Sequence, residues 1–526
     1  MSTRSSHAAA SSSARRRTSR TRLALAFVTT AALLIAATPA LAQQWNFVGS
    51  RQQAMGGAGI GTVNDSTAFY WNPAAMGFKK KGEWDVQLPV TVNLSVENEL
   101  IEQVSDLAVR SGDIEALIDD LEAGDPSILT NGNIGPAMDW LADFDALGES
   151  PQSVHTEIGI GLLGHVGNFA FGGLSNTTAY IFPDVDLSQI GLLQSDLTTF
   201  LANSPAVTGQ QTALKDQIRN DIGGFWTNST ANGNNADRYV DVFVASNEVD
   251  PDDPGTRAII LLLARGVEND ESFAANQSGI VTAGLSIQEI GVSYGYALPS
   301  PWLKRWLDKK ISVGATAKYM MGIAFVRSAR YDEISGGGLG DINEFKDNQI
   351  SHQFGLDLGI DYRPFEFARI GIAARNVNVP RFDGGEFGDI KVKPQVRMGM
   401  SAEPIERWIL ALDVDLTENS NPQLERSPAE DLFRSRLVSL GTEYTIPLGK
   451  PSALALRFGT YKNTHDEINE GWALTGGLGL KLWGFVLDLS AGGGLDRERI
   501  RTDTNKYVNI PDRVNVGLGL KWEKSI

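Results

Sequence analysis

Hydrophobic and polar residues alternate along much of the chain. Between Trp84 and Val96 every second residue is apolar, and the residues in between are mostly polar. A period of two is that of a β-strand with two unlike faces. The run is also longer than most strands of soluble proteins, and it matches the roughly 9–11 residues that a tilted strand needs to cross a bilayer. The pattern therefore predicts a strand with one face toward hydrocarbon and the other toward water.

The same alternation recurs downstream and predicts fourteen strands in all. We place them at residues 84–96, 153–163, 167–180, 281–298, 309–325, 350–363, 367–376, 391–403, 406–417, 434–446, 451–461, 472–483, 484–494 and 512–523. An even number lets the sheet close into a barrel with both chain ends on one side, and closure removes the unpaired edges that lipid cannot satisfy. After the N-terminal region there is no apolar run of about 18 residues, so no transmembrane helix is expected. The predicted fold is an all-β, 14-stranded antiparallel transmembrane β-barrel.

The connections between these strands sort into two kinds. Those after even-numbered strands are short, apart from the one at 298–310, whereas those after odd-numbered strands are longer. Outer-membrane barrels have short periplasmic turns and long external loops. We therefore expect residues 79–526 to form the barrel, with large extracellular insertions at 97–152 and 181–280. A soluble exported sandwich or barrel is the alternative.

Both insertions contain apolar residues at helical spacing, for example Leu100, Val104 and Leu107. Residues 97–150 also carry fourteen acidic residues against a single arginine, Arg110. The simplest interpretation is a solvated cap of amphipathic helices. The alternative is a surface that binds another protein or another cell.

The N-terminus has the features of an export signal. Residues 1–22 contain six arginines and no acidic residue, an apolar run follows, and Ala40–Ala42 forms a small-residue cleavage site. Residues 1–42 are therefore predicted to be a signal peptide, and Gln43 is the expected first residue of the mature chain. We favour the general secretion route, because the hydrophobic residues that follow a twin-arginine pair are missing.

Charge and cysteine content exclude several functions. Without its first 42 residues the chain has 46 − 6 = 40 basic residues against 63 acidic ones, a net charge near −23. So acidic a protein is not expected to bind nucleic acid. The chain has no cysteine, so disulfides and thiolate metal sites are impossible.

A glycine-rich stretch precedes the first strand. Gly56, Gly57 and Gly59 are followed by Asp65 and then by one compact motif, which consists of Phe69, Tyr70, Trp71, Asn72, Pro73 and Ala74. A phosphate-binding loop would need a preceding strand and a following helix, and neither is evident. The stretch resembles the N-terminal signature of the outer-membrane FadL/TodX-type transporter superfamily. Two further stretches, 374–382 and 410–419, are especially similar to the conjugal-transfer TraF-like barrels.

The resemblance implies a barrel whose lumen is plugged by an N-terminal hatch at residues 43–78, with the residues of the glycine-rich stretch forming the hatch or touching a ligand. It implies an outer-membrane protein in contact with lipid, and a channel or transporter for small hydrophobic compounds. The alternative function is a non-transporting surface barrel that takes part in conjugal transfer, secretion or adhesion through its acidic helices.

Charged residues on the inward face of the strands form the last candidate site. The alternation directs inward, and places on adjacent strands, the residues Arg397, Asp413, Asp415, Glu443 and Arg457. Paired carboxylates can act in acid–base catalysis or hold a cation, but with arginines beside them an ion-pair network that holds the hatch is the better interpretation.

The histidines do not indicate catalysis. His165 and His465 are expected in connections, and no serine at a strained turn accompanies His155, which is expected to face the lumen. We therefore expect no enzymatic activity, no catalytic residues, no metal and no other cofactor.

Overall fold

The computed structural model describes residues 45–97, 100–110, 117, 132–149, 153–185, 193–203, 211–230, 233–270, 278–299, 310–330, 349–383, 389–418, 435–465, 471–503 and 506–524. The predicted signal peptide and the expected mature start at Gln43 lie outside these residues.

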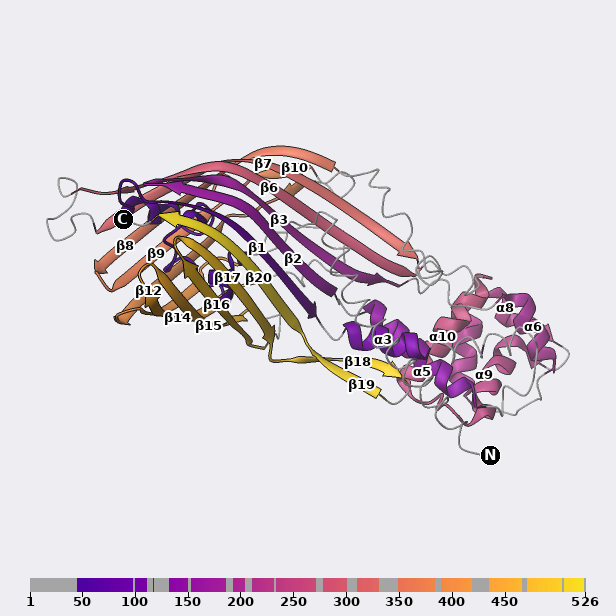
Figure 1. Ribbon diagram of the computed structural model, residues 1–526. Helices are drawn as coiled ribbons and strands as arrows, with labels where there is room; N and C mark the ends of the chain where they lie inside the picture. Colours follow the sequence, from indigo (N-terminus) through magenta and orange to yellow (C-terminus); the bar gives the residue numbers. More distant parts are fainter. Residues whose placement is uncertain are drawn as a thin grey trace, which may run out of the picture.

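Fourteen strands of the described chain form a closed antiparallel barrel, as the alternation predicts (Figure 1). In order around the barrel they are β1 (Trp84–Glu97), β2 (Ser153–Val166), β3 (Phe169–Asp184), β6 (Gly279–Ala297), β7 (Ile311–Arg330), β8 (Gln349–Phe365), β9 (Ala368–Arg375), β12 (Gln395–Ile405), β13 (Trp408–Asp415), β14 (Leu437–Gly449), β15 (Ser452–Asn463), β16 (Ala473–Leu482), β17 (Phe485–Gly494) and β20 (Arg513–Lys524). Strand β20 pairs with β1 and closes the sheet.

Side chains alternate between the outside and the inside of the barrel. Leu88, Phe354 and Leu356 point outward and are 39%, 73% and 38% exposed, whereas Asp85 and Asp357 point inward and are each 2% exposed. A closed, fully hydrogen-bonded sheet with an apolar outer surface is what a bilayer requires of a spanning β-structure. The barrel is therefore a transmembrane one.

The two ends of the barrel differ. Tight turns join β2 to β3, β8 to β9, β12 to β13, β14 to β15 and β16 to β17, all at the end where β20 finishes. We call this the short-turn end and the opposite one the long-loop end. Among outer-membrane barrels the short-turn end faces the periplasm.

Beyond the long-loop end lies a group of helices (Figure 1). They are α3 (Leu100–Val109), α5 (Ile134–Glu149), α6 (Gln194–Asn203), α7 (Thr212–Gln217), η4 (Ile218–Ile222), α8 (Gly224–Thr227), α9 (Asn235–Ser246) and α10 (Pro254–Glu268), with a small hairpin of β4 (Ser229–Thr230) and β5 (Gly233–Asn234). They share a hydrophobic core that includes Leu141, Trp226 and Ile260. None of the helices in the described residues is long and apolar enough to span a membrane.

Two hairpins lie where only loops were expected. One consists of β10 (Arg381–Asp383) and β11 (Asp389–Lys391), and the other of β18 (Arg497–Asp503) and β19 (Lys506–Pro511). The second contacts helix α3, where Arg501 N donates to Ser105 Oγ at 2.9 Å. Their strands are short and carry little alternation, so the sequence pattern did not separate them from loops.

The predicted position of His165 in a connection is wrong. Strand β2 continues to Val166, and His165 is inward-facing and 2% exposed within it. The predicted strand ended at residue 163 because the alternation fades there.

The strand register predicts where an attached probe meets lipid. In β16, Leu478 points outward and is 52% exposed, whereas Lys481 lines the lumen. A fluorophore on Leu478→Cys should be quenched by brominated lipids, and one on Lys481→Cys by iodide in water, with the cysteine-free parent as a clean background. A slip of one residue exchanges the two faces, so the opposite quenching pattern would refute the register.

Candidate functional site

The site is built around the chain segment before the first strand. We call residues 45–78 the N-terminal segment; it comprises α2 (Ser50–Ala54), η1 (Ser66–Phe69) and η2 (Pro73–Phe78). It lies among the inward faces of the strands near the short-turn end, where Figure 1 shows it in indigo. Helix α2 packs against β15, β16, β17 and β20, and η2 against β6, β7 and β8. The segment thus reaches opposite walls of the barrel.

Two polar residues of the glycine-rich stretch start its short helices. Asp65 accepts hydrogen bonds from Thr67 N at 3.1 Å and Thr67 Oγ1 at 2.5 Å, and so caps η1. Asn72 accepts from Ala74 N at 3.1 Å and caps η2, whose first residue is Pro73. A side-chain acceptor before the helix and proline at its first position are the usual ways to begin a helical turn.

The aromatic residues form a cluster at the centre of the segment. The ring centroids of Tyr70 and Trp71 are 5.5 Å apart, and those of Trp45 and Tyr70 are 6.2 Å apart. Wall arginines stack on these rings: the guanidinium of Arg375 lies 3.8 Å from the Tyr70 centroid, and that of Arg397 lies 5.1 Å from the Trp45 centroid. Away from water such cation–π contacts are worth about 2 kcal/mol. They couple the segment to two wall strands.

The glycines bring the segment's backbone into direct contact with the wall. Asp413 Oδ2 accepts from Gly59 N at 2.9 Å and Ile60 N at 2.7 Å. Arg397 donates to Gly57 O at 3.3 Å, and Ser401 donates to Gly61 O at 2.6 Å. Consecutive backbone N–H groups make a natural site for an anion. Here the anion is a carboxylate of the barrel's own wall, so no phosphate is needed to explain the glycines.

The wall is shaped for this contact. At ten wall glycines an added Cβ would collide with the N-terminal segment at 2.8 Å or less: Gly295, Gly314, Gly359, Gly371, Gly399, Gly441, Gly459, Gly477, Gly517 and Gly519. At Gly459 the Cβ would lie 2.2 Å from Gly56 N. Conversely, Gly56 has φ 67° and its own Cβ would lie 2.6 Å from Thr460 O. We call the ten wall positions the glycine belt.

A network of ion pairs lies toward the short-turn end. Arg51 donates to both carboxylate oxygens of Glu443, at 2.8 and 3.0 Å, and Arg457 Nε donates to the same carboxylate at 2.6 Å. Arg457 also contacts Asp488 at 2.5 Å. The bidentate pairing with Glu443 fixes both the position and the orientation of the Arg51 guanidinium.

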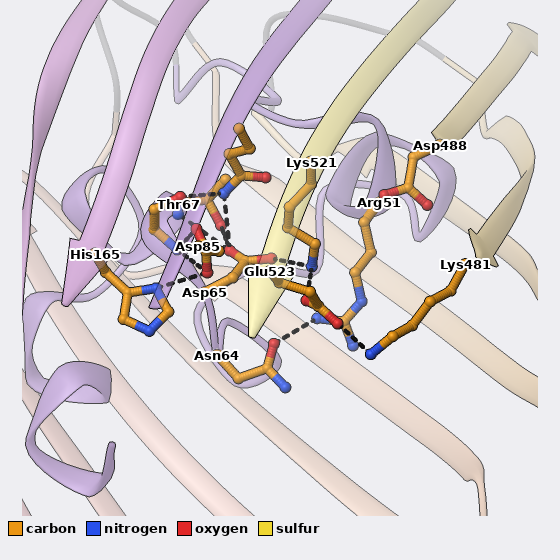
Figure 2. A network of polar contacts seen from close by, with 12 residues as sticks. Arg51, Asn64, Asp65, Thr67, Asp85, His165, Lys481, Asp488, Lys521 and Glu523 are labelled. Atoms are coloured by element: carbon orange, nitrogen blue, oxygen red, sulfur yellow. Dashed lines mark hydrogen bonds and ion pairs between the residues drawn. The ribbon is translucent and has the colours of Figure 1, made fainter. Parts of the chain in front are cut away.

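A second part of this network surrounds Asp65 and opens onto a cavity of about 280 Å³. Figure 2 shows Lys521 between Asp65 and Glu523, at 3.4 and 3.0 Å, and Lys481 on the far side of Glu523 at 2.5 Å. Next to it, Asp85 Oδ2 lies 2.6 Å from His165 Nδ1 and accepts from Ser66 N at 3.2 Å. The cavity is lined by charges of both signs, so it suits water better than an apolar molecule.

Burial and charge act in opposite directions on Asp65. Burial raises the pKa of its carboxyl, but Lys521, the Thr67 hydroxyl and Arg51 stabilise the charged form and hold the pKa well below its usual range. Asp65 is thus ionised in this structure.

The long-loop half of the lumen has a different lining. A group of inward side chains from β3, β6 and β7 is apolar, and hairpin β10–β11 covers it with Phe382 and Ile390. We call the wall part of this group the luminal apolar patch; it consists of Phe182, Ala283, Leu285, Ile287, Met320 and Ala324. Below it the same strands carry Glu289 and Lys318, whose charged groups are 3.0 Å apart. The lining therefore changes from charged to apolar between Glu289 and Ile287 on β6 and between Lys318 and Met320 on β7.

Comparison with known proteins identifies the family. The family model described as "F plasmid transfer operon, TraF, protein" matches residues 69–415. The chain belongs to this family. No curated protein matches the sequence.

Several solved barrels have a similar architecture. The toluene transporter TbuX of Ralstonia pickettii is 14% identical, with 91% of this chain and 98% of that chain covered at a TM-score of 0.40. The toluene transporter TodX of Pseudomonas putida is 10% identical, with 93% and 100% covered at 0.39, and a FadL homologue of Pseudomonas aeruginosa is 10% identical, with 92% and 99% covered at 0.38. A likeness of this extent concerns the fold alone. The closed sheet and apolar exterior of this TraF-family barrel are those of an outer-membrane protein.

The structure brings together the predicted charge pairs. Arg397 Nε lies 2.5 Å from Asp415 Oδ1, Glu443 contacts Arg457, and Asp413 holds the glycine-rich stretch. The predicted residues of that stretch are buried in the barrel, namely Gly56, Gly57, Gly59, Asp65, Phe69, Tyr70, Trp71, Asn72, Pro73 and Ala74. Whether any of them touches a ligand stays a prediction. Within the described residues no three His, Cys, Asp or Glu side chains are grouped so that they could hold a metal.

Sequence reasoning missed Lys521, Glu523, His165 and the glycine belt. Gly399, Gly441 and Gly459 share the inward parity of Arg397, Glu443 and Arg457 on the same strands, and Lys521 alternates with the outward residues Leu520 and Trp522. Parity was therefore a usable signal for them.

The Arg51–Glu443 pair should contribute measurably to stability. Glu443→Gln leaves Arg51 without its bidentate partner and removes one of the two carboxylates that pair with Arg457, in a site where Glu443 is 6% exposed. We expect a loss of about 3 kcal/mol in the free energy of unfolding, because breaking a buried pair strands a charge. Urea unfolding in lipid vesicles measures it. Glu406→Gln is the control, since its pair with Arg407 is exposed and such pairs are worth about 0–1 kcal/mol. Equal losses would contradict the role of Glu443.

Asp65 should make closure sensitive to acid. Its lowered pKa means that its contribution to holding the segment is complete above the ordinary aspartate range, near pH 4, and is lost as the pH falls below it. Conductance in planar bilayers should therefore rise between about pH 4 and pH 2. The Asp65→Asn variant should conduct more at neutral pH and lack this step. A step that persists in the variant would assign it to another group.

Proposed function

We propose that this TraF-family barrel is a gated outer-membrane channel for small hydrophobic compounds, with the N-terminal segment as its hatch. The observation that supports the proposal is the fit between segment and wall. Ten wall positions lack a side chain where the segment passes, and Asp413, Glu443 and Lys521 bind it from three different strands. A lumen this wide is not filled by wall side chains alone, since about eight strands is the limit for that.

The segment is suited to move without unfolding the barrel. The hydrogen bonds between strands run continuously around the closed sheet and do not include it. Its attachments include hydrogen bonds and ion pairs, which water can replace, and apolar contacts with wall residues such as Leu163 and Leu174. It joins β1 directly, so it stays tethered at the short-turn end.

The luminal apolar patch supports a hydrophobic cargo. In this structure Phe382 and Ile390 of hairpin β10–β11 cover the patch, and an apolar molecule can cover the same surface in their place. The patch lies toward the long-loop end, which we expect to face outward. An apolar molecule that enters there and displaces the hairpin reaches the patch before it reaches the N-terminal segment. Polar solutes would gain nothing there.

A second candidate function is a surface protein that takes part in conjugal transfer, secretion or adhesion. It is supported by the helices beyond the long-loop end, which have their own hydrophobic core. Several of their basic residues are paired with acidic ones, as in the buried pair of Lys215 with Asp241 at 2.5 Å, and acidic residues outnumber basic ones in these helices. Such a composition suits a cationic partner.

Glycine-belt variants test the gate. An alanine at Gly441 or Gly459 places its Cβ 2.5 Å or less from backbone atoms of Met55 or Gly56, so the segment has to shift. We expect a severalfold rise in single-channel conductance, and faster uptake of the apolar dye N-phenylnaphthylamine by cells that carry the variants. Gly476→Ala is the matched control, because its nearest neighbour would be 3.7 Å away.

Unchanged conductance in correctly folded belt variants would refute the gate. A rise in conductance without dye uptake would refute the hydrophobic cargo and favour the second candidate function.

A further inference from the structure

The luminal apolar patch is covered by hairpin β10–β11, whose Phe382 ring occupies a socket in the wall. On β7 the inward positions above Lys318 are Met320, Gly322 and Ala324, so a small residue lies between two apolar ones. A Cβ added at Gly322 would lie 2.4 Å from Cδ1 of Phe382. The phenyl ring thus rests directly on the β7 backbone, in a socket that exists because Gly322 has no side chain.

The hairpin that carries this ring is buried by the same surface. Phe382 is 1% exposed, and Ile390 and Val392 are 2% exposed each. The wall contributes Leu285 and Ile287 from β6 and Met320 from β7. Dispersion and hydrophobic contacts with these side chains hold the ring in place.

The described strands of the hairpin are much shorter than those of the barrel. The hairpin strands are three residues each. Asp383 N donates to Ser351 Oγ of β8 at 3.1 Å, and Val392 N donates to Pro380 O within the hairpin's own base at 2.9 Å. A barrel strand is held along its whole length, so the hairpin can lift while the wall stays intact.

The chain that leads into the hairpin is strained. Val379 has φ 53°, a left-handed conformation that a β-branched residue rarely adopts. Asn376, three residues earlier, has φ 54°. Strain of this kind persists only where surrounding contacts enforce it. Here Asn376 N donates to Asp357 Oδ1 at 2.8 Å and Val379 N donates to Asn376 O at 2.9 Å, so the base of the hairpin is held to β8 by contacts that do not involve Phe382.

We propose that the luminal apolar patch is a binding site for a neutral apolar molecule of about the size of a phenyl ring. In this structure Phe382 occupies the site, and a ligand binds by displacing it. The molecule is neutral because the cations directly below, Lys318 and Arg375, are already paired with Glu289 and Asp357. The place of this site in passage rests on the proposed function, but the binding itself does not.

The experiment measures binding of fluorobenzene to the full chain in lipid nanodiscs by fluorine NMR. Phe382→Ala empties the socket and removes the internal competitor, so affinity should rise about ten-fold if the closed hairpin is the dominant state. Gly322→Leu fills the socket and should abolish specific binding. Phe354→Ala is the matched control, because that ring is 73% exposed on the outer wall and its loss should leave binding unchanged.

A disulfide tests the displacement. The chain has no cysteine, so Ser351→Cys with Asp383→Cys gives one cross-link that fixes β10 to β8. Fluorobenzene should bind the reduced form of this variant and not the oxidised one. Equal binding by both forms, or an unchanged affinity in Phe382→Ala, would overturn the proposal.

The readouts separate this inference from the proposed function. Binding that follows the expected order without dye uptake by cells supports the site and counts against the channel. Dye uptake that survives Gly322→Leu counts against the site and leaves the channel standing.

Discussion

A closed barrel of fourteen strands encloses more space than its own side chains can fill. The N-terminal segment meets this constraint, and much of the wall chemistry follows from its presence. Gly56 lies on the backbone at Thr460, and Gly459 leaves room for the backbone at Gly56. The two surfaces approach at backbone distance because side chains are missing on both. A segment packed in this way needs no disulfide, which agrees with a chain that has no cysteine.

Close packing of the two backbones buries N–H groups of the segment, and a charged side chain of the wall accepts their hydrogen bonds. The N–H groups of Gly59 and Ile60 are buried and would be costly if left without a partner. Asp413 accepts from both. Its negative charge is in turn near Arg397, which also binds Asp415 and stacks on Trp45. A single arginine thus links the wall's electrostatics, the segment's backbone and its aromatic cluster.

The alternation made the barrel predictable, because lipid and water impose opposite demands on successive residues of every strand. The pairing of Arg397 with Asp415 and of Glu443 with Arg457 followed from the same parity and from strand order. Parity also places Gly441 beside Glu443 and Gly459 beside Arg457 on the inward face. A glycine in a strand carries no polarity, so only the course of the N-terminal segment shows what it accommodates. Hairpin β10–β11 could not be predicted for another reason. Phe382 and Ile390 are buried by side chains of β6 and β7, and even β7, the nearer of these strands in the sequence, ends at Arg330, more than fifty residues before Phe382.

The lumen therefore contains two obstructions of unlike chemistry. The N-terminal segment is held by ion pairs and backbone hydrogen bonds, which water and acid weaken, together with apolar packing against the wall. Hairpin β10–β11 is held largely by apolar contacts, which an apolar molecule can replace one for one. An apolar molecule that displaces Phe382 then meets Glu289, Lys318 and Arg375, whose charges are already balanced by their neighbours. Such a balanced layer gives a neutral molecule no strong interaction. Opening of the segment alone would thus admit water and ions, whereas passage of an apolar molecule requires both obstructions to move. This is why conductance and dye uptake are separate readouts of one barrel.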